Sequence, residues 1–211
     1  MSFYPQPNKY QCGPFALKYA LVMLGVFKKE DDIGIIAGSN WWSGTDEIGL
    51  ARAARHFNCK LKHFQSNEPE EAKKLLIQEL KDGSPCILSV KNWEHWCTVV
   101  SYQKGHFVVI DSEQDKVISV QSDNQLLRLW RYYDQESKIK SFDGYALVPK
   151  FNVHTRARFT PQKAKIVMYD KNKDLATNWD KYTNDLIYVC QPRTKQKSKI
   201  ITFSEFLRRN E

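Results

Sequence analysis

The chain has 211 residues, of which 42% are hydrophobic and 13% aromatic, so it can bury a sizeable core as one domain or as one domain with an appendage. This composition excludes a chain that is disordered throughout, and no apolar run approaches the roughly 20 residues of a membrane span. The N-terminal residues lack the basic and apolar segments of a secretory signal, so we expect a cytoplasmic protein, with a specialised secretion route left open.

The net charge of +8 is concentrated in the last third of the chain. Residues 151–211 hold 13 Lys and Arg against 6 Asp and Glu, whereas residues 1–150 are nearly balanced. The asymmetry predicts a main domain over residues 1–150 and a basic C-terminal extension or small subdomain over residues 151–211. A basic surface of this kind suits an acidic partner or nucleic acid.

The predicted elements, taken in chain order, are helical first and strand-like afterwards. Helices are expected from residue 12 to about 25, over 30–37 and 45–56, and from 67 to about 80. Strands are expected over 60–64, 86–90, 96–102, 106–110, 117–120 and 145–148, a helix from 123 to about 133, and further strands at 164–169, 186–190 and 200–203. Short turns between the central strands are typical of antiparallel hairpins, and helices followed by a meander predict an α+β domain.

Five cysteines occur, at positions 12, 59, 86, 97 and 190, with no CxxC spacing. An odd count without that spacing disfavours both a disulfide framework and a zinc site in a chain of this size. His95 and Cys97 could in principle share a metal ion, but no second closely spaced pair accompanies them. We therefore expect no metal and no cofactor.

Cys12 stands directly before Gly13 and Pro14, and the ten residues that follow are mostly apolar. Because Pro is favoured at the start of a helix, Cys12 should lie at the N-terminus of a largely buried helix. The unpaired N–H groups and the positive end of the helix dipole favour a thiolate over a thiol there. Cys12 is thus a candidate nucleophile, although most cysteines are packing residues.

Gln6 lies six residues before Cys12, where its amide could fold back toward the sulfur. Together with the backbone N–H of Cys12, that amide would form a two-donor site for the oxyanion of a tetrahedral intermediate. Gln11 is nearer in sequence, but a residue directly before the helix should point away from the thiol. We therefore prefer Gln6.

His95 precedes one predicted strand, and Asp111 follows the next. With a turn at Lys104 and Gly105, the start of the first strand lies opposite the end of the second, so the two residues should be cross-strand neighbours. A carboxylate in that position would fix the imidazole tautomer and orient the ring toward a thiolate. In isolation, each could equally be an ordinary structural residue.

These residues, in this order, resemble the bacteriocin-processing, double-glycine-leader cysteine peptidases and their stand-alone relatives, within the papain-like superfamily. The resemblance rests on Gln6, on Cys12-Gly13-Pro14 with Ala16-Leu17, on Gly44-Thr45 opening a helix, on His95-Trp96 before a strand, and on Asp111. It extends over roughly residues 6–149. It implies a papain-like fold, in which an N-terminal helical layer that carries the nucleophile packs on an antiparallel sheet.

The resemblance also implies a role for four residues. Cys12 is the nucleophile, His95 the general base and acid, Asp111 the residue that orients His95, and Gln6 the oxyanion donor. The implied activity is that of a thiol hydrolase, which cleaves a peptide bond in a peptide or protein through an acyl-enzyme intermediate. Family members that cut leader peptides are often fused to a transporter, and here there is no apolar span and no GxxxxGK[ST] phosphate loop, so a leader-peptide substrate is not implied.

Two other functions stay open at this stage. A deamidase or an acyltransferase would use the same catalytic residues on a different substrate or acceptor. A non-catalytic papain-like binding module could instead use the basic residues 151–211 to dock an acidic partner or nucleic acid.

Three tryptophans are candidates for contact with a substrate. Trp93 and Trp96 flank His95 and could form the wall of a cleft, although a Trp beside a strand is more often part of the core. Trp41 and Trp42 are adjacent in a loop rich in Gly and Ser, where both cannot easily face inward. One of them is therefore expected to be exposed for binding, and Trp42 is our candidate.

Overall fold

Three helices follow one another near the N-terminus of the computed structural model, which describes residues 3–114, 117–153, 155–158, 187–190 and 199–201. They are α1 (Cys12–Met23), α2 (Glu30–Ala37) and α3 (Glu47–His56). Helix α1 is apolar apart from Lys18, which pairs with Glu30, and all 12 of its residues are buried. Phe15 and Tyr19 pack with residues of the sheet, whereas Leu17 and Leu21 pack with residues of α2 and α3. Helix α1 is therefore the centre of this layer.

Seven antiparallel strands form one sheet, in the order β1-β7-β2-β3-β4-β5, with β6 paired to β7. Their bounds are β1 (Cys59–Ser66), β2 (Cys86–Val90), β3 (His95–Gln103), β4 (His106–Ile110), β5 (Ile118–Ser122), β6 (Tyr132–Tyr133) and β7 (Lys140–Pro149). Strand β7 lies between β1 and β2, so the strand of this sheet that comes last in the sequence occupies an interior position.

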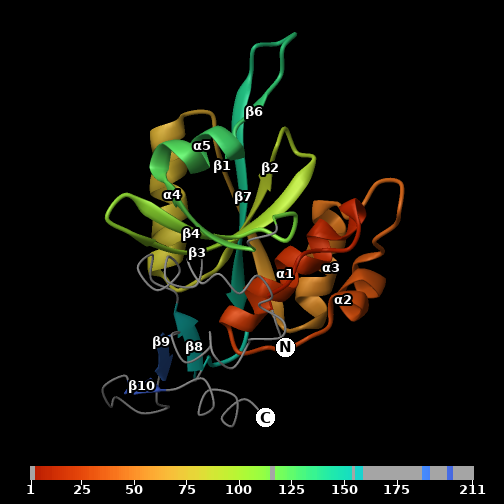
Figure 1. Cartoon of the computed structure of the whole chain (residues 1–211), viewed down its shortest axis with the longest axis vertical. Coiled ribbons are helices and arrows are strands. Elements are labelled where there is room, and N and C mark those ends of the chain that lie inside the picture. The colour runs from red at the N-terminus through yellow and green to blue at the C-terminus, as the bar shows by residue number, and fades with distance from the viewer. Residues whose placement is uncertain (1–2, 115–116, 154, 159–186, 191–198, 202–211) are drawn as a thin grey trace.

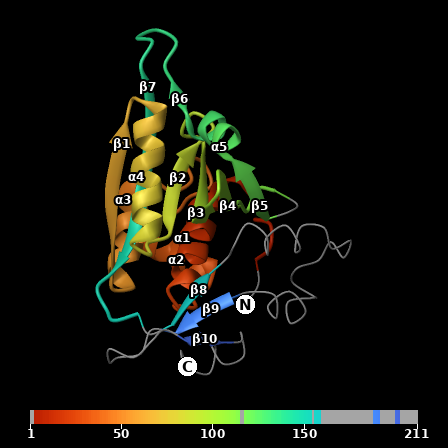
Figure 2. The same cartoon turned by 90° about the vertical axis from the view of Figure 1, so that its left-hand side faces the viewer.

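Helices cover both faces of this sheet, as Figures 1 and 2 show. Helices α1 to α3 lie on one face, and α4 (Pro69–Lys81) and α5 (Asp123–Trp130) lie on the other. The alternation of side chains along β4 explains this arrangement, because Val108 and Ile110 pack with α1 while Phe107 and Val109 belong to the cluster with α4 and α5. The predicted α+β class, with a helical layer on an antiparallel sheet, is confirmed.

Two helix boundaries differ from the predicted ones. The helix predicted to reach about residue 133 ends at Trp130, and Tyr132–Tyr133 pair with β7 instead, since aromatic residues favour strands. Helix α3 is capped by Asp46, whose side chain accepts the N–H of Gly49 at 2.7 Å. Thr45, which was predicted to open this helix, is therefore left outside it.

A second antiparallel sheet is formed by β8 (Thr155–Arg158), β9 (Ile187–Cys190) and β10 (Lys199–Ile201), in the order β10-β9-β8. Strands β9 and β10 overlap predicted strands, β8 was not predicted, and the strand predicted at 164–169 lies outside the described residues. The domain boundary near residue 150 stays a prediction. No helix in the described part of the chain has the length and apolar character that crossing a membrane requires.

Gly144 lies at a point of the sheet where a side chain does not fit. It pairs with Phe64 on β1 and with Leu88 on β2, and a Cβ on residue 144 would lie 2.4 Å from Cζ of Phe64. We expect Gly144→Ala to lower the free energy of unfolding by about 1–3 kcal/mol, because it overpacks the core. Urea denaturation followed by circular dichroism measures the change.

The matched control is Gly34→Ala in α2. A Cβ on residue 34 would meet Pro14 at an ordinary 3.5 Å, and Ala is favoured over Gly inside a helix by about 1 kcal/mol. This variant should be as stable as the wild type or more stable. Equal losses in the two variants would contradict the packing argument.

Candidate active site

Cys12 begins helix α1, and two contacts hold this end of the helix in place. The hydroxyl of Thr98 on β3 donates to the carbonyl oxygen of Ala16 at 2.8 Å. On another side, Gly13 lies so close to Thr45 that a Cβ on residue 13 would be 2.7 Å from the Cβ of Thr45. Packing therefore requires a glycine after the cysteine. These contacts place Cys12, which is only 5% exposed, beside the start of β3.

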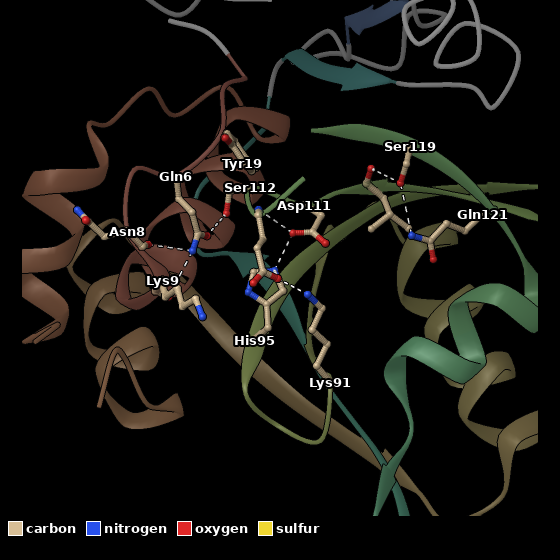
Figure 3. A network of polar contacts seen from close by, with 12 residues as sticks. Gln6, Asn8, Lys9, Tyr19, Lys91, His95, Asp111, Ser112, Ser119 and Gln121 are labelled. Atoms are coloured by element: carbon tan, nitrogen blue, oxygen red, sulfur yellow. Dashed lines mark hydrogen bonds and ion pairs between the residues drawn. The ribbon is translucent and has the colours of Figure 1, made fainter. Parts of the chain in front are cut away.

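His95 is the first residue of β3, and its Nε2 lies 2.6 Å from Oδ1 of Asp111, directly after β4 (Figure 3). Both side chains are buried, with 4% and 2% of their surfaces exposed. Cys12 is the other group that acts on this imidazole, because together with Asp111 it raises the pKa of His95. Since Asp111 occupies Nε2, Nδ1 is the nitrogen left for the sulfur. Thiol, imidazole and carboxylate therefore belong to one local cluster.

The β3–β4 hairpin does not place His95 directly opposite Asp111, the arrangement expected from the sequence for cross-strand neighbours. Thr98 pairs with Ile110, and the ladder shifts between Val99 and Ser101, so an extension of this register would place Asp111 opposite Cys97. His95 is thus displaced by two residues from the position directly across the hairpin. Diagonal neighbours of this kind remain within reach of long side chains, and the hydrogen bond forms.

Each residue of the His95–Asp111 pair stabilises the charged form of the other. Burial by itself lowers the pKa of His95, but the hydrogen bonds to Asp111 and Cys12, with their charges, raise that pKa to about 9. Burial by itself raises the pKa of Asp111, but the hydrogen bond and charge of His95 hold it below its ordinary value. At neutral pH the pair is therefore an imidazolium against a carboxylate.

Gln6 is connected to both parts of the site (Figure 3). Its backbone N–H donates to the carbonyl oxygen of Ser112 at 2.8 Å, and its Oε1 accepts the hydroxyl of Ser112 at 2.6 Å. Its Nε2 donates to the carbonyl oxygens of Asn8 at 2.9 Å and Lys9 at 3.3 Å, in the segment that leads into α1. The amide is therefore oriented by the residue that follows Asp111.

The predicted aromatic contacts separate into buried and exposed ones. Trp96 is only 9% exposed, and its Nε1 donates to the carbonyl oxygen of Thr45 at 2.8 Å. It supports the loop before α3, and its burial leaves little surface for the substrate contact that the sequence suggested. Trp42 and its neighbour Trp41 are 71% and 74% exposed, so both face solvent rather than one. Trp93 is half-exposed and stacks on a tyrosine.

Lys91 and Glu113 lie at the site but were not identified from the sequence. The ammonium of Lys91 donates to Oε2 of Glu113, and that oxygen is 3.9 Å from Nε2 of His95. The only local signal was the position of Glu113, two residues after Asp111. Its N–H donates to Oδ1 of Asp111 at 3.0 Å, as is common for a residue two positions after an aspartate.

Among the described residues, no three His, Cys, Asp or Glu side chains are grouped so that they could hold a metal ion.

No family model matches the sequence, and no curated protein matches it. Among solved structures, the peptidase domain of Streptococcus ComA, a bifunctional ABC transporter involved in quorum sensing, is similar with a TM-score of 0.53 and 18% identity, over 70% of this chain and 98% of that one. A double glycine motif protease from an AMS/PCAT transporter, solved in complex with the leader peptide, has a TM-score of 0.52 and 18% identity, over 69% of this chain and 89% of that one.

The chain has the fold of these peptidase domains. The resemblance to double-glycine-leader peptidases that the sequence suggested is confirmed at the level of the fold.

The raised pKa of His95 predicts a pH dependence of stability. Because the folded protein holds this proton more tightly than an ordinary histidine of pKa 6.5, the stabilisation is complete below pH 6.5 and is lost as the pH rises through about 9. Asp111→Asn removes the partner that contributes most to raising the pKa of His95. The free energy of unfolding of this variant should therefore fall less with rising pH. It should also move the NMR titration of the His95 C2–H below the wild-type midpoint near pH 9. The resonance is assigned through His95→Gln, and a wild-type midpoint at 6.5 would contradict the pairing.

Proposed function

We propose that the protein is a cysteine peptidase, which cleaves an amide bond in a peptide or protein. The observation that carries the proposal is the hydrogen bond of His95 Nε2 to a buried carboxylate, with Cys12 close enough to raise the pKa of the same imidazole. The similarity in fold to two peptidase domains supports it. Deamidation and acyl transfer would use the same residues, and we choose peptide cleavage because the similar structures are peptidases.

In the first step, the thiolate of Cys12 attacks the substrate's carbonyl carbon, and the carbonyl oxygen becomes an oxyanion. The backbone N–H of Cys12 and the Nε2 of Gln6 are the proposed donors to that oxyanion. Both hydrogens of Nε2 are directed at backbone carbonyl oxygens in the free protein. The bond to Lys9 is the longer one, at 3.3 Å, so it is the one that the oxyanion replaces.

In the second step, the imidazolium of His95 gives its proton to the departing amine, and the C–N bond breaks. The acyl group is then held on the sulfur as a thioester. Neutral His95 takes a proton from water, the resulting hydroxide attacks the thioester, and the thiolate leaves. Asp111 keeps the imidazole oriented through both proton transfers and stabilises its charged form.

Selective alkylation tests the nucleophile. We expect iodoacetamide at neutral pH to modify Cys12 faster than any other cysteine in the folded protein, with sites and rates measured by peptide mapping. Cys59, Cys86 and Cys97 are fully buried internal references, and burial raises the pKa of Cys59 to about 11 and raises the pKa of the other two thiols well above its ordinary value. His95→Ala should slow the reaction at Cys12. A rate at Cys12 no higher than at Cys59 would contradict the proposal.

Cleavage itself tests the mechanism. Incubation with a peptide library, with new N-termini identified by mass spectrometry, should reveal cleavage that Cys12→Ala and His95→Ala abolish. Gln6→Ala should lower kcat by about 10²–10³-fold, since it removes one oxyanion donor. The rate should decline above about pH 9, where His95 loses the proton that the leaving amine needs. Full activity in Cys12→Ala would overturn the proposal.

A further inference from the structure

We propose that Lys91 and Glu113 form a positioning pair, which keeps the imidazole of His95 bonded to Asp111 and sets the pH range over which His95 stays protonated. The inference deepens the proposed function and rests on it for its kinetic readout, while its spectroscopic readout is independent of activity. Figure 3 shows Lys91 next to His95 and Asp111.

The first observation is a second carboxylate near the same imidazole nitrogen. Nε2 of His95 lies 2.6 Å from Asp111, and it lies 3.9 Å from Oε2 of Glu113. Asp111 is buried, whereas the side chain of Glu113 is 34% exposed. A free Glu113 carboxylate would therefore attract the imidazolium away from Asp111 and toward solvent, and this rotation would also move the ring relative to Cys12.

Lys91 prevents that competition. Its ammonium binds Oε2 of Glu113, the same oxygen that faces His95. The bound cation neutralises the carboxylate and occupies a lone pair that the imidazolium would otherwise use. It also brings a positive charge near Asp111 that helps to keep this carboxylate ionised.

The position of Lys91 is set by an unusual backbone turn between β2 and β3. Lys91, Asn92 and Trp93 are three consecutive non-glycine residues in the left-handed region, with φ of 55°, 56° and 68°. Such conformations cost of the order of 1 kcal/mol or more each, and they persist only where the surroundings impose them.

Three contacts impose this turn. The N–H of Lys91 donates to the carbonyl oxygen of Leu129 at 3.0 Å, and the side-chain oxygen of Asn92 accepts the N–H of Tyr133 at 3.2 Å. Trp93 stacks on Tyr132, with ring centroids 4.0 Å apart. The end of α5 and strand β6 thus hold the turn that presents Lys91.

Glu113 is fixed from the other side. Its backbone N–H donates to Oδ1 of Asp111, the oxygen that also binds His95. The ion pair therefore joins the turn that precedes His95 to the segment that carries Asp111. This connection is why we assign it a positioning role rather than that of an incidental surface pair.

The titratable groups that face His95 come from three segments. They are Cys12 on α1, Asp111 and Glu113 after β4, and Lys91 in the β2–β3 turn. Tyr19 on α1 and Cys97 on β3 also feel the charge of Asp111, but burial raises the pKa of both well above the neutral range, so they stay uncharged.

The test compares Lys91→Met, Glu113→Gln and the double variant. Lys91→Met leaves an uncompensated carboxylate near the imidazole, so the basic limb of kcat/KM should move to higher pH, and kcat should fall about tenfold because the ring is misplaced. Glu113→Gln leaves the ammonium alone, so the basic limb should move to lower pH. Each shift should be about 0.5–1 pH unit, since both groups are partly exposed and screened. The double variant should return the limb to near its wild-type position, and so should Lys91→Arg.

The matched controls change ion pairs elsewhere. Lys62 on β1, which β7 and β2 separate from β3, pairs with Glu79 on α4, and Glu70 pairs with Lys73 within α4. Lys62→Met and Glu70→Gln should leave the pH profile unchanged.

NMR titration of the His95 C2–H in the same variants is the second readout. The midpoint of this titration should move to higher pH in Lys91→Met and to lower pH in Glu113→Gln, as the basic limb of kcat/KM does. Shifts in one common direction, or none in either variant, would overturn the positioning pair. If the wild type neither cleaves peptides nor reacts at Cys12, the proposed function fails, and the titration still decides on the pair.

Discussion

The buried hydrogen bond between His95 and Asp111 is the interaction on which the whole site depends. It joins the first residue of β3 to the residue directly after β4, and it overcomes the burial that would otherwise lower the pKa of His95. A buried imidazole without this carboxylate would be neutral at physiological pH and free to rotate. With it, the imidazole is charged, oriented and able to meet a sulfur at the end of a helix.

The fold supports that bond by placing α1 between the sheet and two other helices. Because all of its residues are buried, α1 has little freedom to slide, and the Thr98–Ala16 hydrogen bond ties its first turn to β3. Gly13 allows the loop at Thr45 to approach, and Trp96 then holds that loop from the sheet. The segment around Cys12 and the segment around His95 are therefore held in place by the same contacts. A substitution that displaces one segment should also displace the other.

Local signals explain what the sequence could predict. The start of α1 followed from Cys12-Gly13-Pro14, and α5 starts with a capping box between Ser122 and Gln125, a pattern that is readable from spacing alone. The end of α5 was not predicted, since the strand preference of Tyr132–Tyr133 decides the outcome only together with β7, which offers them a partner. The α+β class and the resemblance in fold were likewise accessible from element order and motif spacing.

Features that depend on tertiary contacts were not accessible. Lys91 and Glu113 are 22 residues apart, and nothing in their local sequences distinguishes them from solvated surface charges. Residues 91–93 adopt the left-handed conformation, but none of them is a glycine that would indicate a turn in the sequence. Contacts with α5 and β6 impose this turn. The register of the β3–β4 hairpin was not accessible either, because it depends on the pairing of Gln103 with His106 at the turn and on a bulge between Val99 and Ser101, and a bulge leaves no mark in a pattern of alternating side chains.

Trapping the acyl-enzyme tests the central claim most directly. An activated ester of a short peptide, quenched with acid and mapped by mass spectrometry, should leave an acyl group on Cys12 of the wild type that disappears as turnover proceeds. His95→Ala should accumulate little of this adduct at neutral pH, because the sulfur has lost the imidazolium that pairs with its thiolate. An acyl group spread over several cysteines, or equal acylation of Cys12 with and without His95, would contradict the account.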